Sequence, residues 1–184
     1  MKAENQQHLL KIARAAISRT LEKAGGKFPE TGSLPGELLE KRATFVTLTI
    51  DGRLRGCIGM LEACRPLAVD VAENACAAAF EDPRFPPLTK AEFKKLEIHI
   101  SILSPPEEMQ FLSEADLLRQ IRPGIDGLIL QEGFRRGTFL PSVWDELPEK
   151  ELFWAHLKLK AGLPADYWSD ALRVFRYTAD CFPA

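Results

Sequence analysis

An arginine and a cysteine with chemical potential share the segment 54–59, which has the sequence Leu-Arg-Gly-Cys-Ile-Gly and is called here the Arg–Cys segment. Cys57 carries a thiol, and Arg55 carries a planar guanidinium that can bind a carboxylate or phosphate through two hydrogen bonds. A nearby cation also lowers the pKa of a thiol. Cys57 and Arg55 are therefore candidate catalytic residues, as thiolate and anion clamp. The competing interpretation is that Cys57 is an inert buried side chain.

Two further pairs of residues are candidate binding residues. Gly56 and Gly59 interrupt a strand pattern, and glycine in a strand marks a bulge or a place where a backbone or ligand approaches closely. The proline-rich loop, residues 82–87, contains Arg84 and Phe85, a guanidinium beside an aromatic side chain that could anchor a partner. The alternative for Phe85 is that it fills the core beneath this loop.

The patterns around two histidines and a second cysteine favour structural roles for these side chains. His99 alternates with isoleucines and is expected to point away from the apolar face of its strand, and His156 is expected on a helix beside Phe153. Cys76 falls among small residues of a helix and is expected in the core. The spacing of these side chains predicts no metal site, and the sequence identifies no cofactor.

Composition limits the class of protein. The chain has 184 residues, of which 46% are hydrophobic and 27% charged, so it is long enough to build its own core. The formal charge of −2 disfavours nucleic-acid binding through bulk electrostatics. No apolar run approaches the roughly 20 residues that span a bilayer, and the polar N-terminus lacks a signal-peptide core. The expected location is the cytoplasm.

The Arg–Cys segment belongs to a predicted hairpin. Residues 44–50 and 53–59 are two β-prone runs joined by Asp-Gly, a strong signal for a tight two-residue turn. With those two residues alone as the loop, Ile50 pairs with Arg53, Leu48 with Arg55 and Val46 with Cys57. These six side chains would share one face of the hairpin, although a bulge at Gly56 would shift this register and separate Arg55 from Cys57.

The remaining periodicity predicts a single domain over residues 1–184, with a core at about 44–178 and an N-terminal helix over 5–24 that ends at Gly25-Gly26. A helix after Pro66, followed by a strand at 96–102, could complete a strand–helix–strand crossover. Helix 149–163 is expected to carry five side chains on or near one face, namely Leu152, Phe153, His156, Leu159 and Leu163. Other expected elements are a helix at 113–119, a hairpin within 128–140 and a strand at 172–178.

Several segments resemble the AMMECR family, whose bacterial and archaeal members are named AmmeMemoRadiSam system protein A. The matching pieces are residues 44–48, 54–59, 66–67, 82–87, 127–128, 140–143 and 160–163 before Trp168, and the Arg–Cys segment is the specific one. The resemblance implies an α+β fold, with a mixed or antiparallel sheet flanked by helices and a smaller subdomain packed beside it. It also implies an association with a Memo-like protein and a radical SAM protein.

This chain departs from the family pattern in two places. Family members often carry Pro-Gln-Val where this chain has Pro-Ser-Val at 141–143, and a cysteine where it has residues 157–159. No role of that glutamine or cysteine can therefore be transferred to this chain.

Two functional hypotheses follow. In the first, the protein binds a ligand or partner in a cleft lined by the Arg–Cys segment and acts with the Memo-like and radical SAM proteins; its role could be catalytic, through Cys57 and Arg55. In the second, it is a non-catalytic adaptor that recruits a protein through Arg84 and Phe85.

Overall fold

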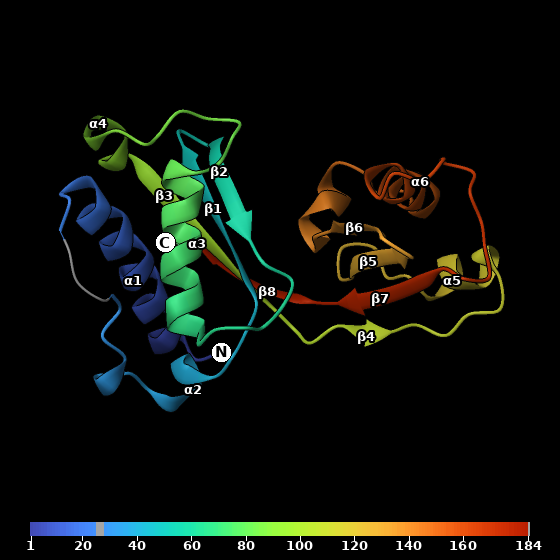
Figure 1. Ribbon diagram of the computed structural model, residues 1–184, viewed down its shortest axis with the longest axis horizontal. Helices are drawn as coiled ribbons and strands as arrows, with labels where there is room; N and C mark the ends of the chain where they lie inside the picture. Colours follow the sequence, from blue (N-terminus) through green and yellow to red (C-terminus); the bar gives the residue numbers. More distant parts are fainter. Residues whose placement is uncertain (25–27, 184) are drawn as a thin grey trace. The chain divides into compact units, whose positions relative to one another are not determined.

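The computed structural model describes residues 1–24 and 28–183. The chain divides into two compact units, Met1–Leu103 with Asp180–Ala184 (unit 1) and Ser104–Ala179 (unit 2) (Figure 1). Each unit combines helices with strands of a four-stranded sheet, which confirms the α+β class. That residues 1–184 form a single domain stays a prediction. Among the described residues, no helix is both long and apolar enough to cross a membrane.

The sheet of unit 1 has the strand order β2-β1-β3-β8. Its strands are β1 (Thr44–Ile50), β2 (Arg53–Gly59), β3 (Leu96–Leu103) and β8 (Ala179–Pro183). Because β1 is antiparallel to both β2 and β3, those two strands run parallel with β1 between them. Helix α3 (Leu67–Phe80) connects them, so the predicted strand–helix–strand unit is present. Strand β8 was not predicted.

Helices α1 (Ala3–Leu21) and α3 cover one face of this sheet (Figure 1). Leu48, Ile98 and Ile100 are fully buried there, because alternate residues of a strand point to the same face. α1 confirms the helix predicted for 5–24, while its predicted stop at Gly25-Gly26 lies outside the described residues. Short helices α2 (Gly36–Leu39) and α4 (Lys90–Phe93) and a 3-10 turn, η1 (Thr31–Ser33), complete unit 1.

A β-bulge corrects the predicted hairpin register. Asp51 and Gly52 form the turn at positive φ, and Ile50 faces Arg53 as expected. The register then shifts: Thr49 pairs with Leu54 but Leu48 pairs with Gly56, so Arg55 is an extra residue without a partner on β1. Thr47, and not Val46, pairs with Cys57. An extra residue reverses the alternation of side chains along β2, so the simple register, with Arg55 and Cys57 on the face of Val46 and Leu48, was wrong, and the alternative of a bulge next to Gly56 is the one that the structure contains.

Gly56 lets α3 approach β2 closely. It pairs with buried Leu48 and therefore lies on the face covered by the helices. A Cβ atom at this position would lie 2.0 Å from the carbonyl oxygen of Ala78 on α3. Gly59 is similarly restricted, since its Cβ would lie 2.3 Å from both the Phe45 ring and the Thr44 carbonyl oxygen. Both glycines are therefore required by packing within the chain.

Unit 2 contains the sheet β4-β7-β5-β6. Its elements are β4 (Glu107–Glu108), α5 (Glu114–Gln120), β5 (Gly127–Glu132), β6 (Arg135–Phe139), η2 (Pro141–Asp145), α6 (Lys150–Lys160) and β7 (Arg173–Tyr177). The predicted helix, hairpin, second helix and strand are all present. The predicted apolar face of α6 needs correction, because Phe153, Trp154 and Leu157 are buried whereas Leu152 and Leu159 are exposed.

The close approach at Gly56 leads to a stability prediction. Gly56→Ala forces its new methyl group into the backbone of α3, and we expect it to lower the free energy of unfolding by about 2–4 kcal/mol. Urea denaturation of the purified protein measures this. Gly36→Ala is the matched control, since nothing lies within 4 Å of the position its Cβ would take, and its effect should stay within about 0.5 kcal/mol. Equal stability of the two variants would contradict the packing role of Gly56.

Candidate functional site

The structure brings together the two segments that the sequence identified separately. Side chains and backbone from β2, the proline-rich loop and α4 meet at the outer edge of β2. We call this cluster the β2 corner; it consists of Arg55, Cys57, Asp82, Arg84, Phe85 and Glu92. The two candidate catalytic residues, Arg55 and Cys57, and the two candidate binding residues of the proline-rich loop, Arg84 and Phe85, therefore belong to one region of unit 1.

Asp82 links the components of the β2 corner. This buried side chain follows the end of α3 and accepts hydrogen bonds from two residues. The Cys57 N–H donates to its Oδ2 at 2.9 Å, and Arg84 donates from its backbone N–H (3.1 Å), Nε (2.9 Å) and Nη2 (2.6 Å). The hydrogen bonds from Arg84 hold the pKa of Asp82 well below its usual range, with a further contribution from the Cys57 N–H. The carboxylate is thus ionised throughout the neutral range.

The same contacts protect the edge of the sheet. β2 is an outer strand, so its outward-pointing backbone groups have no neighbouring strand. At Cys57, Asp82 accepts the N–H, and Arg84 Nη2 donates to the carbonyl oxygen at 3.4 Å. The proline-rich loop therefore takes the place of a neighbouring strand at this one residue.

Arg55 is held inside the β2 corner by a carboxylate from the chain itself. Its Nε and Nη2 donate to Glu92 at 2.8 and 3.3 Å, and Nη2 also donates to the Pro86 carbonyl oxygen at 2.8 Å. Glu92 in turn caps α4 by accepting from Thr89. These bonds, chiefly the one from Arg55, lower the pKa of Glu92 to about 2. The positive charge of Arg55 is thus already balanced by Glu92 and is not available to clamp an anionic ligand.

Phe85 lies beside both guanidinium groups. The Cζ atoms of Arg55 and Arg84 are 5.7 and 5.6 Å from the centroid of its ring, within the range of cation–π attraction. The Phe85 side chain is half-buried, whereas 53% of the Arg84 side chain is exposed. The corner therefore presents an aromatic ring and a guanidinium to solvent, both held by internal contacts.

The Cys57 thiol lies apart from the Arg55 guanidinium. Cys57 pairs with Thr47, whose neighbours Val46 and Leu48 are buried beneath the helices, so both Cys57 and Thr47 lie on the opposite face of the sheet. The half-buried thiol is 3.2 Å from the Thr47 hydroxyl. Arg55 instead lines a cleft of about 530 Å³ with residues 50, 51, 53, 54 and 92, and Cys57 does not contribute to it.

This geometry favours binding through surface contacts over catalysis that depends on an unpaired charge. Asp82 balances the charge of Arg84, and Glu92 balances that of Arg55, so neither guanidinium is an unpaired cation beside the thiol. Within residues 1–24 and 28–183, no three histidine, cysteine, aspartate or glutamate side chains are arranged to hold a metal ion. The features available to a ligand or partner are the Phe85 ring, the exposed part of Arg84 and the Cys57 thiol.

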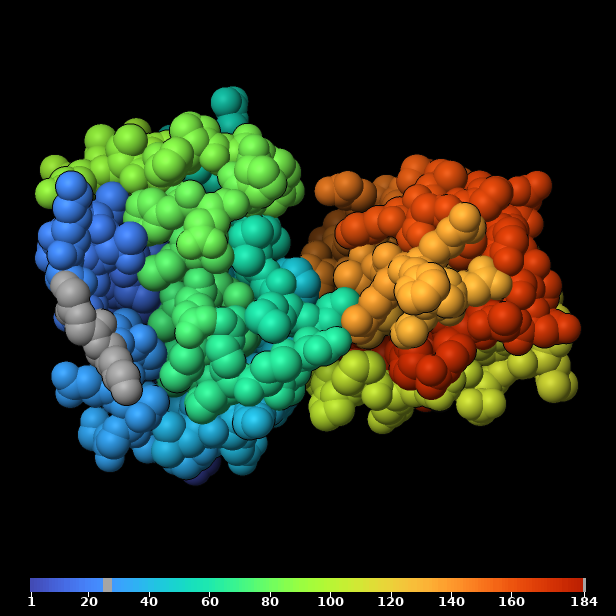
Figure 2. Space-filling view, in the orientation of Figure 1, coloured from blue at the N-terminus to red at the C-terminus, as the bar shows by residue number. Residues whose placement is uncertain are grey.

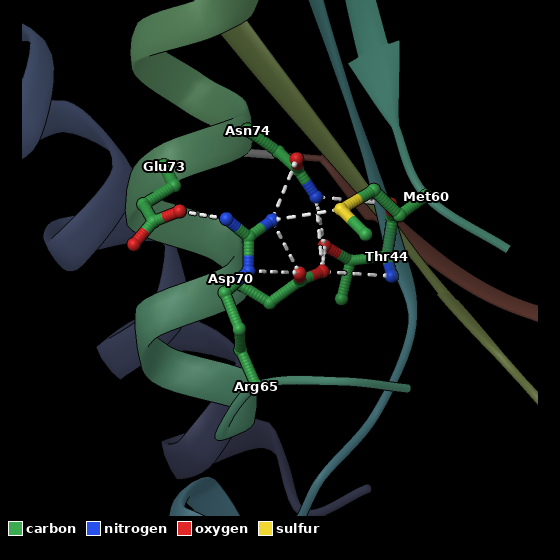
Figure 3. A network of polar contacts seen from close by, with 6 residues as sticks. All are labelled: Thr44, Met60, Arg65, Asp70, Glu73 and Asn74. Atoms are coloured by element: carbon green, nitrogen blue, oxygen red, sulfur yellow. Dashed lines mark hydrogen bonds and ion pairs between the residues drawn. The ribbon is translucent and has the colours of Figure 1, made fainter. Parts of the chain in front are cut away.

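A second polar cluster lies at the start of α3 (Figure 3). The buried Asp70 carboxylate accepts from the Thr44 N–H (3.0 Å) and hydroxyl (2.6 Å), from Asn74 (2.9 Å) and from Arg65 Nε (3.0 Å). The Arg65 guanidinium also pairs with Glu73 and donates to the Met60 sulfur. Since Asp70 is satisfied by these groups, the cluster fixes the first residue of β1 to α3 and serves the fold.

Sequence patterns do not reveal the acidic partners in the two clusters. They mark Asp82 only as part of the proline-rich loop, and they do not single out Glu92 or Asp70. One signal was available, because Thr89 and Glu92 have the spacing of a capping box, which the structure contains. The pairing of Glu92 with Arg55 joins residues 37 positions apart, and no local pattern indicates it.

His99, His156 and the cysteines other than Cys57 are not part of the β2 corner. His99 lies on the face of β3 away from the helices, as expected, and its Nε2 is 3.5 Å from the Thr49 hydroxyl. His156 is exposed on α6. Cys76 packs against the core, and burial raises the pKa of its thiol. Cys64 and Cys181 are exposed.

Comparison with known proteins identifies relatives along nearly the whole chain. The AMMECR1 family model matches residues 10–182. A protein of Methanothermobacter thermautotrophicus is 41% identical over 177 residues, which cover 95% of this chain and 91% of that protein. A Thermotoga maritima protein is 43% identical over 152 residues, covering 80% of this chain and 82% of its own length. The crystal structure of an uncharacterised Pyrococcus horikoshii protein superposes with a TM-score of 0.91 at 37% identity, covering 100% of this chain and 93% of that one.

The Asp82 carboxylate leads to a prediction about pH dependence. Because its pKa is lower in the folded protein than its ordinary value of 3.8, its ionised form stabilises the fold above that value, and this stability is lost as the pH falls through the folded pKa. Asp82→Asn should lower the free energy of unfolding at pH 7 by about 2 kcal/mol and weaken its decline in acid. Urea denaturation at pH 7 and in the acid range measures both effects.

Asp51→Asn is the control for this substitution, since the Asp51 side chain is 75% exposed and lies 3.9 Å from Lys95. Its effect should stay within about 0.5 kcal/mol. If Asp82→Asn destabilises the protein no more than Asp51→Asn does, the Asp82 contacts do not hold the β2 corner together.

Proposed function

Because the chain belongs to the AMMECR1 family, and because its Arg–Cys segment is fixed to the proline-rich loop, we propose that it is a binding component that acts with a Memo-like protein and a radical SAM protein. The single observation that supports the location of the contact is the half-buried Phe85 ring beside the partly exposed Arg84. Both are held in place before any partner arrives. The partners themselves rest on the family resemblance.

The physical argument is preorganisation. Phe85 follows a fixed Asp82–Arg84 pair, its backbone N–H donates to the Asp82 carbonyl oxygen at 3.1 Å, and Leu88 is buried just beyond the two prolines. Green atoms of this loop lie at the surface of unit 1 in Figure 2. A rigid loop loses little conformational entropy on binding, and aromatic and arginine side chains contribute most of the energy in many interfaces.

Co-purification tests this proposal. Phe85→Ala removes the aromatic ring but keeps the Asp82–Arg84 pair, and we expect it to weaken association with the Memo-like or radical SAM protein at least tenfold, as for the loss of a hot spot. Arg84→Ala combined with Phe85→Ala should weaken it further. Thermal denaturation of each variant confirms that it folds.

A matched control is available in unit 2, where Phe134 and Arg135 are also adjacent and exposed. Phe134→Ala with Arg135→Ala should leave association unchanged. Unaltered association of a folded Phe85→Ala variant would contradict the proposed contact, and failure of the wild-type chain to associate with either protein would contradict the proposed partners.

The second candidate function is catalysis by the Cys57 thiol. The observation in its favour is that this thiol is half-buried, on the sheet face away from the helices, and adjacent to the Thr47 hydroxyl. Against it, the Arg55 guanidinium lies apart from the thiol, and Arg84, which contacts the Cys57 backbone, is paired with Asp82; both facts weaken the electrostatic activation that reactive thiols require. The binding proposal needs no activated thiol.

Thiol-labelling kinetics separate these two functions. In a background with Cys64→Ser and Cys181→Ser, we expect iodoacetamide to modify Cys57 more slowly in the folded protein than in urea, because burial slows access and the Arg55 and Arg84 charges are already paired. Cys57→Ala should keep its partner association. Faster labelling of the folded protein at Cys57, together with loss of pathway activity in Cys57→Ala, would instead support catalysis.

A further inference from the structure

An apolar stripe lies on the solvent side of α6, opposite the side chains that α6 buries. It consists of Leu152, Ala155, His156 and Leu159, which recur at the spacing of one helix face. Leu152 is 45% exposed and Leu159 is 54% exposed, so about half of each residue is open to solvent. The core-facing side of α6 is already complete, with Phe153, Trp154 and Leu157 buried, and folding does not require a second apolar face.

The order of side chains makes the stripe self-complementary. Leu152 precedes Ala155 by three residues, and Leu159 follows His156 by three. If two stripes pack antiparallel across a twofold axis that passes between Ala155 and His156, each Leu152 meets the Leu159 of the other copy. Ala155 has only a methyl side chain and allows the helices to approach at the middle. Such a contact is isologous and closes as a dimer.

Charge favours this antiparallel arrangement. Glu149 lies at the start of α6 and Lys160 at its end, both exposed and eleven residues apart, which is about three helical turns. They therefore lie on the same flank of the stripe, and the antiparallel arrangement places Glu149 of each copy near Lys160 of the other. Lys160 Nζ also lies 4.9 Å from the Phe139 ring centroid, an interaction that leaves the lysine exposed. The opposed helix dipoles favour the same direction.

From this symmetry and charge pattern we infer that the solvent side of α6 is a self-association surface that joins two copies of this chain as an antiparallel helix pair. Four side chains from each copy make an interface smaller than that of a permanent dimer. The dimer is therefore reversible, with a Kd between about 10 µM and 1 mM. This inference is independent of the β2 corner and of the proposed partners.

Sedimentation equilibrium of the full chain tests the inference. Between about 10 µM and 1 mM, the average mass should rise from the monomer value of 20.6 kDa toward twice that value. Leu152→Asp and Leu159→Asp should each keep the protein monomeric over this range without unfolding it, since both side chains are exposed. Leu112→Asp is the matched control, because Leu112 is 97% exposed elsewhere in unit 2 and should leave association unchanged.

Charge reversal tests the antiparallel direction. Glu149→Lys alone and Lys160→Glu alone should each weaken association at least threefold by placing like charges opposite each other, whereas the double variant should regain wild-type association. A monomer at every concentration, or association that persists in Leu152→Asp and Leu159→Asp, would overturn the inference. Additive weakening in the charge-reversed double variant would overturn the antiparallel arrangement.

Discussion

The hydrogen bonds of one buried carboxylate determine the arrangement of the β2 corner. Asp82 stands where α3 ends and accepts from the backbone N–H of Cys57 and from Arg84, so it joins a helix, an edge strand and the proline-rich loop. A carboxylate in this position would be costly if its donors were missing, because burial disfavours the charge. The position of Phe85 and the protection of the β2 edge both depend on these contacts.

The Arg–Cys segment can be explained largely by geometry. Gly56 and Gly59 sit where a Cβ would collide with neighbouring backbone or ring atoms, and Arg55 occupies a bulge and pairs with Glu92. Cys57 contributes its backbone to the Asp82 contacts, and only its thiol is left without an evident structural requirement. The segment thus acts as a packing and anchoring element that presents the proline-rich loop, which is why the binding proposal places the contact at Phe85 and Arg84.

Much of the fold was predictable because it depends on local signals. Asp51-Gly52 indicated the hairpin turn, the isoleucines of β3 indicated its buried face, and Ser113 indicated the start of α5, where it accepts a hydrogen bond from Asp116. The bulge at Arg55 was left open by local signals, since Gly56 marked it as an alternative to the simple two-residue register without deciding between the two. It also reversed the face of Cys57.

Local sequence signals were also insufficient to predict the buried face of α6 and the contacts of the candidate site. A helical pattern with apolar residues on two sides does not reveal which side meets the core. Phe153 and Trp154 are buried, and Leu152 and Leu159 are exposed, because of the sheet against which α6 packs. The Asp82–Cys57 and Arg55–Glu92 contacts join residues 25 and 37 positions apart. Sequence patterns identified both halves of the β2 corner, but only the fold showed that they meet.

The most direct test of this account is hydrogen exchange at the Cys57 amide, measured by NMR in the wild-type protein. If Asp82 holds this N–H, the amide should exchange as slowly as the central amides of β1, although β2 is an edge strand. Exchange at the rate of an unprotected edge amide would contradict the account, since the Arg–Cys segment would then not be anchored to the proline-rich loop.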